Sequence, residues 1–144
     1  MNAKQYLRQA YRIDQLIRSN KKEIEELREL STCISGIDTS KEVVQTSKSG
    51  DASYVKIIER IDELEKLIKS DIDKLLNLKI EIRNIIDSVP DSEERLLLHY
   101  RYLHFMNWEE ICESMYVSER TIHRIHGRAL NSVDGILNVG SSWH

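Results

Sequence analysis

Apolar residues recur at steps of three and four along most of the chain, which is the spacing of one face of an α-helix. From Ala3 to Leu30 this pattern predicts a coiled-coil seam over three heptads. The seam residues are Tyr6, Ala10, Ile13, Ile17, Asn20, Ile24 and Leu27. Asn20 either fixes helix register or oligomeric state within the seam, or lies on the helix surface near a local break.

A second and stronger apolar row runs from Tyr54 to Val89 and predicts a helix about 54 Å long. Its seam consists of Tyr54, Ile57, Ile61, Leu64, Ile68, Asp71, Leu75, Leu78, Ile82, Ile85 and Val89, with a flanking row at Ile58, Leu67, Ile72, Leu76 and Ile86. The first helix can cover only one stripe of this wide surface. The surplus predicts a homo-oligomer, most simply a dimer.

Residues 31–53, which separate these two rows, have a different composition. The stretch STCISGIDTSKEVVQTSKSGDAS is rich in Ser and Thr, contains Gly36 and Gly50, and shows no helical period. It predicts a connector, either a flexible linker or an interaction loop, that is long for a plain helix-helix loop. Residues 1–90 as a whole are expected to form a long helical hairpin, a coiled-coil oligomerisation region.

Three helix starts follow Pro90, each marked by a residue that can cap a helix. They are Asp91 with Glu94, Asn107 with Glu110, and Ser118. Predicted core positions at helical spacing are Leu97, Tyr100 and Leu103, then Ile111, Cys112 and Met115, then Ile122, Ile125 and Ala129. Residues 91–144 are therefore expected to form a three-helix helix-turn-helix module, with the tail 134–144 packed on it or frayed and Trp143 as a packing anchor. The expected fold class is all-α.

The link between the second and third of these helices is only Tyr116 and Val117. So short a link predicts the sharp corner of a helix-turn-helix. On the third helix, Arg124 and Arg128 lie about 40° and 80° from Arg120, because residues advance by about 100° each. The apolar residues of that helix lie on the other side. An ordinary surface helix can also carry three arginines, but the capped helix and short corner before it favour DNA binding.

The charge balance limits how tightly this module can bind DNA alone. The net charge of the chain is −3, and from Asp91 onward five arginines stand against eight acidic residues. Affinity for DNA comes largely from neutralising phosphates. A single module is thus expected to bind weakly, and a second copy on an adjacent half-site or a partner already on the DNA would be needed.

Other chemistry is not expected. The sequence contains no nucleophile elbow, P-loop, dinucleotide fingerprint or HExxH motif, so we expect no enzymatic activity and no cofactor. His123 and His126 could share a metal, but no third ligand is evident, and no metal site is expected. Cys33 and Cys112 lie far apart, which favours a reduced, cytoplasmic protein. The charged N-terminus and the lack of a long apolar run argue against secretion or membrane insertion.

The run from Leu97 to Leu130 resembles region four of bacterial sigma factors. The matching signals are the Leu-Tyr pattern before Trp108, the WEEI that begins the second helix, and Val117-Ser118 before a helix ending in Arg128-Ala129-Leu130. The whole chain resembles small phage and prophage proteins of Gram-positive bacteria, grouped with the ArpU and RinA-like transcriptional regulators. One departure is Tyr116, where the pattern usually has glycine because the corner favours a left-handed backbone.

This resemblance implies a sequence-specific DNA-binding regulator of late phage genes that acts near promoters, in the cytoplasm of the bacterial host. The implied partners are double-stranded DNA and host RNA polymerase. The DNA-binding residues in the sigma-like register are Ser118, Glu119, Arg120, Thr121, His123, Arg124 and Arg128. Two other functions remain open: the DNA-recognition subunit of a phage packaging terminase, and an assembly protein whose coiled coil binds a protein partner.

Overall fold

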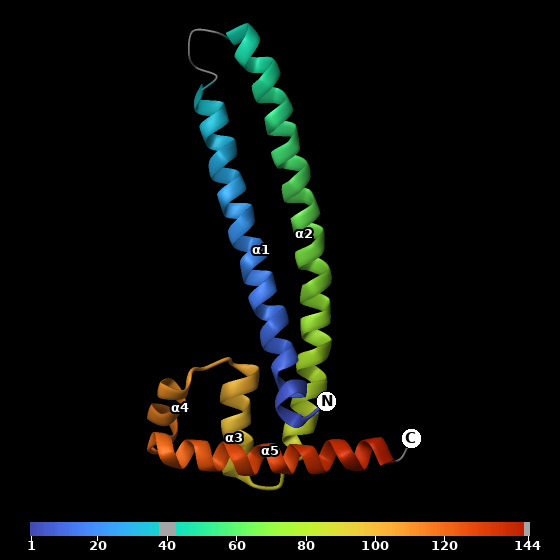
Figure 1. The fold of residues 1–144 in the computed structure, drawn as a ribbon, viewed down its shortest axis with the longest axis vertical. Coiled ribbons are helices and arrows are strands. Elements are labelled where there is room, and N and C mark those ends of the chain that lie inside the picture. The colour runs from blue at the N-terminus through green and yellow to red at the C-terminus, as the bar shows by residue number, and fades with distance from the viewer. Residues whose placement is uncertain (38–42, 143–144) are drawn as a thin grey trace. The chain divides into compact units, whose positions relative to one another are not determined.

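The computed structural model describes the backbone of residues 1–37 and 43–142 and the side chains of residues 1–34 and 51–139. The regular elements of these residues are all helices (Figure 1). They are α1 (Ala3–Ile37), α2 (Val43–Asp87), α3 (Ser92–Leu98), the π-helical segment η1 (His99–Leu103), α4 (Trp108–Met115) and α5 (Glu119–Ser142). The predicted all-α class is confirmed. No helix in this part of the chain is long and apolar enough to cross a membrane.

The helices group into two compact units. One, the hairpin unit, consists of residues 14–73. The other, the helix-turn-helix unit, consists of residues 1–13 and 74–144. The two long helices contribute to both units. The functional division predicted at residue 90 stays a prediction.

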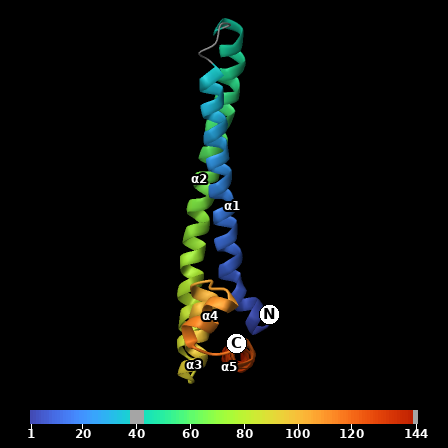
Figure 2. The same ribbon diagram turned by 90° about the vertical axis from the view of Figure 1, so that its left-hand side faces the viewer.

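In the hairpin unit, α1 and α2 run antiparallel and side by side (Figures 1 and 2). Two ion pairs join them, Arg28 to Glu65 at 3.3 Å and Arg60 to Glu23 at 3.5 Å. All four side chains are largely exposed, so each pair contributes less than about 1 kcal/mol. Burial of the apolar seam stabilises the hairpin more than these ion pairs do. The predicted burial is confirmed at Ile17, Ile24, Ile57, Leu64 and Ile68.

Two polar residues are buried in this seam. Asn20 and Asp71 are both at most 9% exposed, and neither Nδ2 of Asn20 nor Oδ2 of Asp71 has a hydrogen-bond partner among the described residues. The burial of Asn20 favours its interpretation as a seam residue over a surface position. Each unpaired buried group costs about 1–3 kcal/mol. Such residues lower the stability of a seam but can specify its register.

Helix extends further into the predicted connector than the sequence indicated. α1 continues to Ile37 and α2 begins at Val43, so only residues 38–42 of the predicted connector 31–53 lie outside the described backbone. The prediction of a long non-helical connector was wrong. Once a helix is nucleated, each added residue gains a backbone hydrogen bond, whereas Ser and Thr lower helix propensity by no more than about 0.7 kcal/mol each.

The apolar rows of α2 are confirmed except at two positions. Tyr54, predicted in the seam, is 42% exposed, and Ile86, predicted in the flanking row, is fully buried. The rest of the flanking row stays exposed, namely Ile58, Leu67, Ile72 and Leu76. Tyr54 lies near the beginning of the described α2 side chains, whereas Ile86 joins the core of the helix-turn-helix unit.

The core of the helix-turn-helix unit is built from segments far apart in the sequence. The predicted residues Ile111, Ile122, Ile125 and Ala129 are buried. They form one cluster with residues of the first turns of α1 and the end of α2, namely Ala3, Leu7, Ala10, Ile82, Ile86 and Val89. In addition, the backbone amide of Ala3 donates to the Asp134 carboxylate at 2.7 Å. The core thus does not begin at Asp91.

A π-helical segment, η1, directly follows α3. Its amide at His104 donates to the His99 carbonyl five residues earlier, at 3.1 Å. The wider turn rotates the following residues relative to an α-helix. Tyr102, four residues after the buried Leu98, is only 3% exposed, whereas Tyr100, predicted in the core, is half-buried and packs against it.

The predicted tail is part of α5, which continues to Ser142. Val133 is fully buried, and Ile136 and Leu137 pack against the core. The prediction that the tail 134–144 packs on the module is therefore confirmed at these two residues, which belong to α5. Trp143 lies outside the described residues.

We expect Leu7→Ala to destabilise the helix-turn-helix unit by about 2–5 kcal/mol, because it leaves a cavity in a fully buried site. Urea unfolding followed by tryptophan fluorescence and circular dichroism measures the change. Leu96→Ala, at a 42% exposed position of α3, is the matched control and should cost much less. Equal losses for the two variants would contradict the shared core.

Candidate nucleic-acid interface

A short corner joins α4 and α5. Tyr116 ends α4 with φ 57° and ψ 44°, in the left-handed region, and its amide donates to the Cys112 carbonyl. The Val117 amide donates to the same carbonyl at 3.2 Å. The ring of Tyr116 is 93% exposed and so contributes little packing. The predicted two-residue corner is confirmed. Because Tyr116 has a β-carbon, its left-handed conformation costs about 1–2 kcal/mol, a penalty that glycine would not have.

Both helices of the motif begin with the predicted caps. The Asn107 side chain accepts from the Glu110 amide at 2.8 Å and donates to the Glu110 carboxylate at 3.1 Å. The Ser118 hydroxyl accepts from the Thr121 amide at 3.2 Å and donates to the Thr121 hydroxyl at 3.0 Å. These bonds satisfy backbone donors at the start of each helix and set where α5 begins.

The cap of α3 differs in part from its prediction. Asp91 accepts from the Glu94 amide at 3.1 Å, as expected. The Glu94 carboxylate does not close a capping box but accepts from the Ser132 hydroxyl of α5 at 2.8 Å. This bond links α3 to α5.

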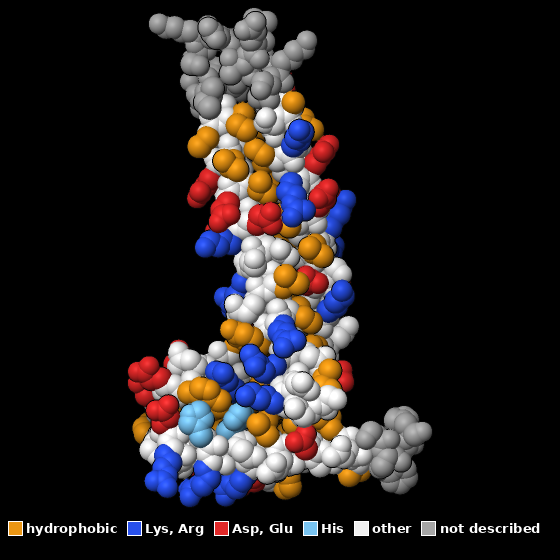
Figure 3. All heavy atoms as spheres, in the orientation of Figure 1, with side chains coloured by type: hydrophobic (Ala, Val, Ile, Leu, Met, Phe, Trp, Pro, Cys, Tyr) orange, Lys and Arg blue, Asp and Glu red, His pale blue; other side chains and the backbone are white. Residues whose placement is uncertain are grey.

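The predicted DNA-binding residues lie together on the start of α5. Thr121 is half-buried, and the others are exposed, namely Ser118, Glu119, Arg120, His123, Arg124 and Arg128. Arg120 and Arg124 make no hydrogen bond or ion pair with any described residue. Their guanidinium groups are thus available to an outside ligand. Figure 3 shows Lys and Arg side chains gathered along this edge of the unit.

The flanking residues are held by neighbours. Arg128 lies 3.9 Å from the Glu93 carboxylate, and the His123 ring lies 3.8 Å from the carboxylate of Glu119. The His123 ring also packs on Trp108 of α4, with 4.9 Å between ring centroids. The freedom of the basic side chains therefore decreases from Arg120 and Arg124 to Arg128.

The folded helix-turn-helix unit is less acidic than residues 91–144 alone, because it includes further basic residues. The helix-turn-helix unit also includes residues 1–13, which contain three basic residues and no acidic one, and the end of α2. In total it contains eleven Lys or Arg against ten Asp or Glu. The added basic residues are Lys4, Arg8, Arg12, Lys74, Lys79 and Arg83. Sequence reasoning missed them because only tertiary contacts bring these residues to the module.

His126 is a buried member of α5, 9% exposed. Its Nε2 shares a hydrogen bond of 2.7 Å with the Tyr102 hydroxyl, and its ring packs edge-on against Trp108. Burial, followed by the charges of Lys4, Arg101 and His123, lowers the pKa of His126 to about 4. The imidazole is therefore neutral at pH 7. Among the described residues no three His, Cys, Asp or Glu side chains are grouped to hold a metal.

A family model described as "Protein of unknown function (DUF1492)" matches residues 34–134, more than half of the chain. The chain belongs to the DUF1492 family. No curated protein and no solved structure matches the chain. The DUF1492 match includes α2, α3, η1, α4 and most of α5, and hence all seven predicted DNA-binding residues. The first turns of α1, which complete the core, lie outside it.

The depressed pKa of His126 predicts a pH dependence of stability. The unfolded chain binds this proton near pH 6.5, whereas the folded one resists it to about 4. The stabilisation is thus complete above pH 6.5 and decreases as the pH falls toward 4. Between pH 7 and 5, we expect the wild type to lose about 1–2 kcal/mol more unfolding free energy than His126→Gln.

Urea titrations at several pH values measure this difference. The matched control is His104→Gln, since His104 is exposed. Its pH profile should follow the wild type. Parallel profiles for wild type and His126→Gln would show that His126 is not a neutral buried group.

Proposed function

We propose that the protein is a sequence-specific DNA-binding regulator of phage transcription that reads DNA with α5. The observation that supports this most is the pair Arg120 and Arg124. Both are exposed, neither has a partner among the described residues, and they lie on one side of a helix that follows a short left-handed corner. Arginine can bind a guanine edge in the major groove with two hydrogen bonds, which is worth about 1–3 kcal/mol of discrimination.

The neighbouring residues have roles consistent with this reading. Glu119 and Thr121 share the groove-facing side with the two arginines, while Ser118 at the cap can contact a phosphate. Arg128, already near Glu93, is better suited to a phosphate contact than to a base. His123 flanks the reading face and is oriented by Trp108.

The finer proposal follows from the sigma region-four and ArpU/RinA-like resemblance. The regulator would act at promoters of late phage genes in the cytoplasm of the bacterial host, in contact with host RNA polymerase. Weak binding by one module fits this role, because a polymerase or a second copy already on the DNA raises the effective concentration of the reading helix.

A homo-oligomer, most simply a dimer, is part of the proposal. The hairpin unit leaves seven large apolar side chains at least 42% exposed among its described residues, and a second copy would cover such a surface. They are Leu16, Leu30, Tyr54, Val55, Ile58, Leu67 and Ile72. Two copies would also present two reading helices to adjacent half-sites.

The same apolar surface also favours a second candidate, the recognition subunit of a packaging terminase. Such a subunit would form a ring of many copies, whereas a promoter-binding regulator is expected to be a dimer. Selection of bound fragments from the phage genome separates the two functions, because packaging sites and late promoters lie at different positions.

We expect Arg120→Ala and Arg124→Ala each to weaken binding to a selected site by about 1–3 kcal/mol and to relax sequence preference at one or two base pairs. Arg128→Ala should instead weaken binding to all sequences and reduce its salt dependence. Fluorescence anisotropy on the selected site and on single-base variants at several salt concentrations measures these effects.

Arg18→Ala is the control for charge, since Arg18 is exposed and lies in the hairpin unit. It should leave sequence preference unchanged. Wild-type affinity and preference in both Arg120→Ala and Arg124→Ala would show that α5 does not read DNA.

For the oligomer, we expect the double substitution Ile58→Glu and Ile72→Glu to dissociate the protein while the hairpin stays helical, because both side chains are exposed within one copy. Light scattering at micromolar concentration gives the mass, and circular dichroism gives the helicity. Lys69→Glu, an exposed charge reversal on the same helix, is the control. A monomer mass for the wild type would refute self-association.

A further inference from the structure

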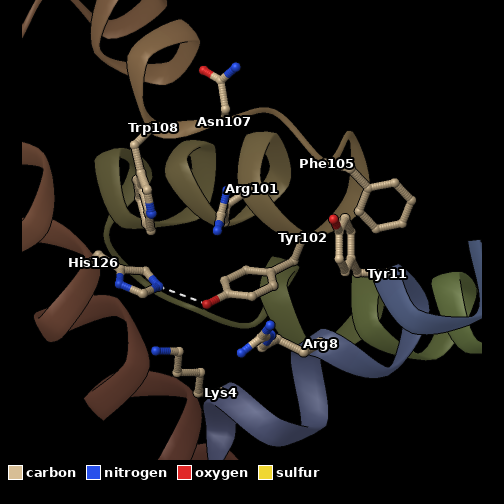
Figure 4. Close-up of a pocket in the computed structure, with 9 residues that line it drawn as sticks. All are labelled: Lys4, Arg8, Tyr11, Arg101, Tyr102, Phe105, Asn107, Trp108 and His126. Carbon is tan, nitrogen blue, oxygen red and sulfur yellow. Dashed lines mark hydrogen bonds between the residues drawn. The ribbon is translucent and has the colours of Figure 1, made fainter. Parts of the chain in front are cut away.

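The helix-turn-helix unit contains a cavity of about 290 Å³ bordered by the start of α1, η1, the start of α4 and α5 (Figure 4). Three cationic side chains line it, Lys4 and Arg8 from α1 and Arg101 from η1. Their nitrogen ends lie around the ring of Tyr102 and beside His126 in Figure 4. No acidic side chain is among the nine that line the cavity.

The positive charge of these three side chains is not neutralised by any acidic side chain that lines the cavity. Lys4 and Arg8 make no hydrogen bond or ion pair with the described residues. Arg101 donates a hydrogen bond to the Met106 carbonyl at 3.0 Å. This bond orients the Arg101 guanidinium, but a carbonyl has no net negative charge to neutralise it. The Asp134 carboxylate, on the same helix as His126, is occupied by the Ala3 amide. Like charges gathered in this way repel one another until an anion joins them.

The walls of the cavity are aromatic. Tyr11, Tyr102, Phe105 and Trp108 line it, and Arg101 lies over the Trp108 ring, 4.5 Å from its centroid. Small-ligand pockets combine such apolar walls with a few convergent polar groups, and this volume is near the lower end of their range. A phosphate of the DNA backbone needs only cations, whereas aromatic side chains that line a cavity also offer contacts for a ring.

We propose that this cavity binds a small organic anion, a phosphate or carboxylate carried on a flat ring. The oxyanion would accept hydrogen bonds from Lys4 and Arg8, and the ring would lie among the aromatic side chains. The neutral imidazole of His126 and the Tyr102 hydroxyl supply further hydrogen-bonding groups at the end of the cavity. The proposal does not rest on DNA reading by α5.

Phenyl phosphate is the probe, because it combines one oxyanion with one ring. In the full-length Trp143→Phe variant, Trp108 becomes the only tryptophan and its fluorescence reports on the cavity. We expect saturable binding of phenyl phosphate, at least about tenfold tighter than inorganic phosphate or phenol. Equal or unsaturable responses to all three compounds would overturn the proposal.

Arg8→Gln should weaken phenyl phosphate binding by about tenfold or more, since it removes one charge-assisted contact. Arg12→Gln, one turn further along α1 at an exposed position outside the cavity lining, is the matched control and should bind like the wild type. Without ligand, Arg8→Gln should melt at the same temperature as the wild type or higher, because the substitution relieves repulsion. This result would separate a binding defect from a folding defect.

A DNA titration tests whether the cavity residues bind the phosphates of DNA instead of a small organic anion. If Arg8→Gln weakens DNA binding as much as Arg120→Ala while phenyl phosphate fails to bind the wild type, the cavity residues contact DNA and the small-anion site is refuted. Retained DNA affinity in Arg8→Gln together with lost phenyl phosphate binding supports the site.

Discussion

The structure depends on closure of one hydrophobic core by both ends of the chain. The helices α3, α4 and α5 do not form this core by themselves. Leu7 and Ala10 from α1, with Ile82 and Ile86 from α2, complete the cluster. A helix-turn-helix is usually regarded as a self-contained module, but here the corner and α5 are supported by two helices that also form the hairpin unit.

The same closure determines the electrostatics of the unit. It brings an acid-free basic segment, residues 1–13, against a module with an acidic sequence. Lys4 and Arg8 thus lie beside Arg101 and the buried pair of Tyr102 and His126. On the outer side of α5, Arg120 and Arg124 have no hydrogen-bond or ion-pair partner among the described residues. One packing arrangement therefore creates both an exposed basic edge and a basic cavity.

In the seam of the hairpin unit, buried apolar residues add stability, whereas two buried polar residues lower it. Ile17, Ile24, Leu64 and Ile68 stabilise the seam, whereas Asn20 and Asp71 lower its stability without a partner among the described residues. Several large apolar side chains outside the seam stay exposed, because the two helices of one copy do not cover them. Self-association would cover them, and in the proposed function it would bring a second copy of α5 to the DNA.

Much of the local structure could be predicted from the sequence, because local chemistry decides it. Helical spacing of apolar residues identified both long helices, and the caps Asn107 and Ser118 identified the starts of α4 and α5. The exposed face of α5 also follows from helical geometry. Tyr116 showed where the corner lies, although a non-glycine residue there made its left-handed backbone unexpected.

The tertiary structure decided what depends on long-range contacts. A row of apolar residues states which face of a helix is buried but not against what, so the roles of Leu7 and Ile86 in the module core were not visible. The spacing also did not show that Tyr102 is buried while Tyr100 packs only partly against the core. The basic cavity combines residues more than one hundred positions apart, from Lys4 to His126, and charge counted along the chain cannot reveal such a cluster. Only folding brings these residues together, because their proximity follows from packing of the core.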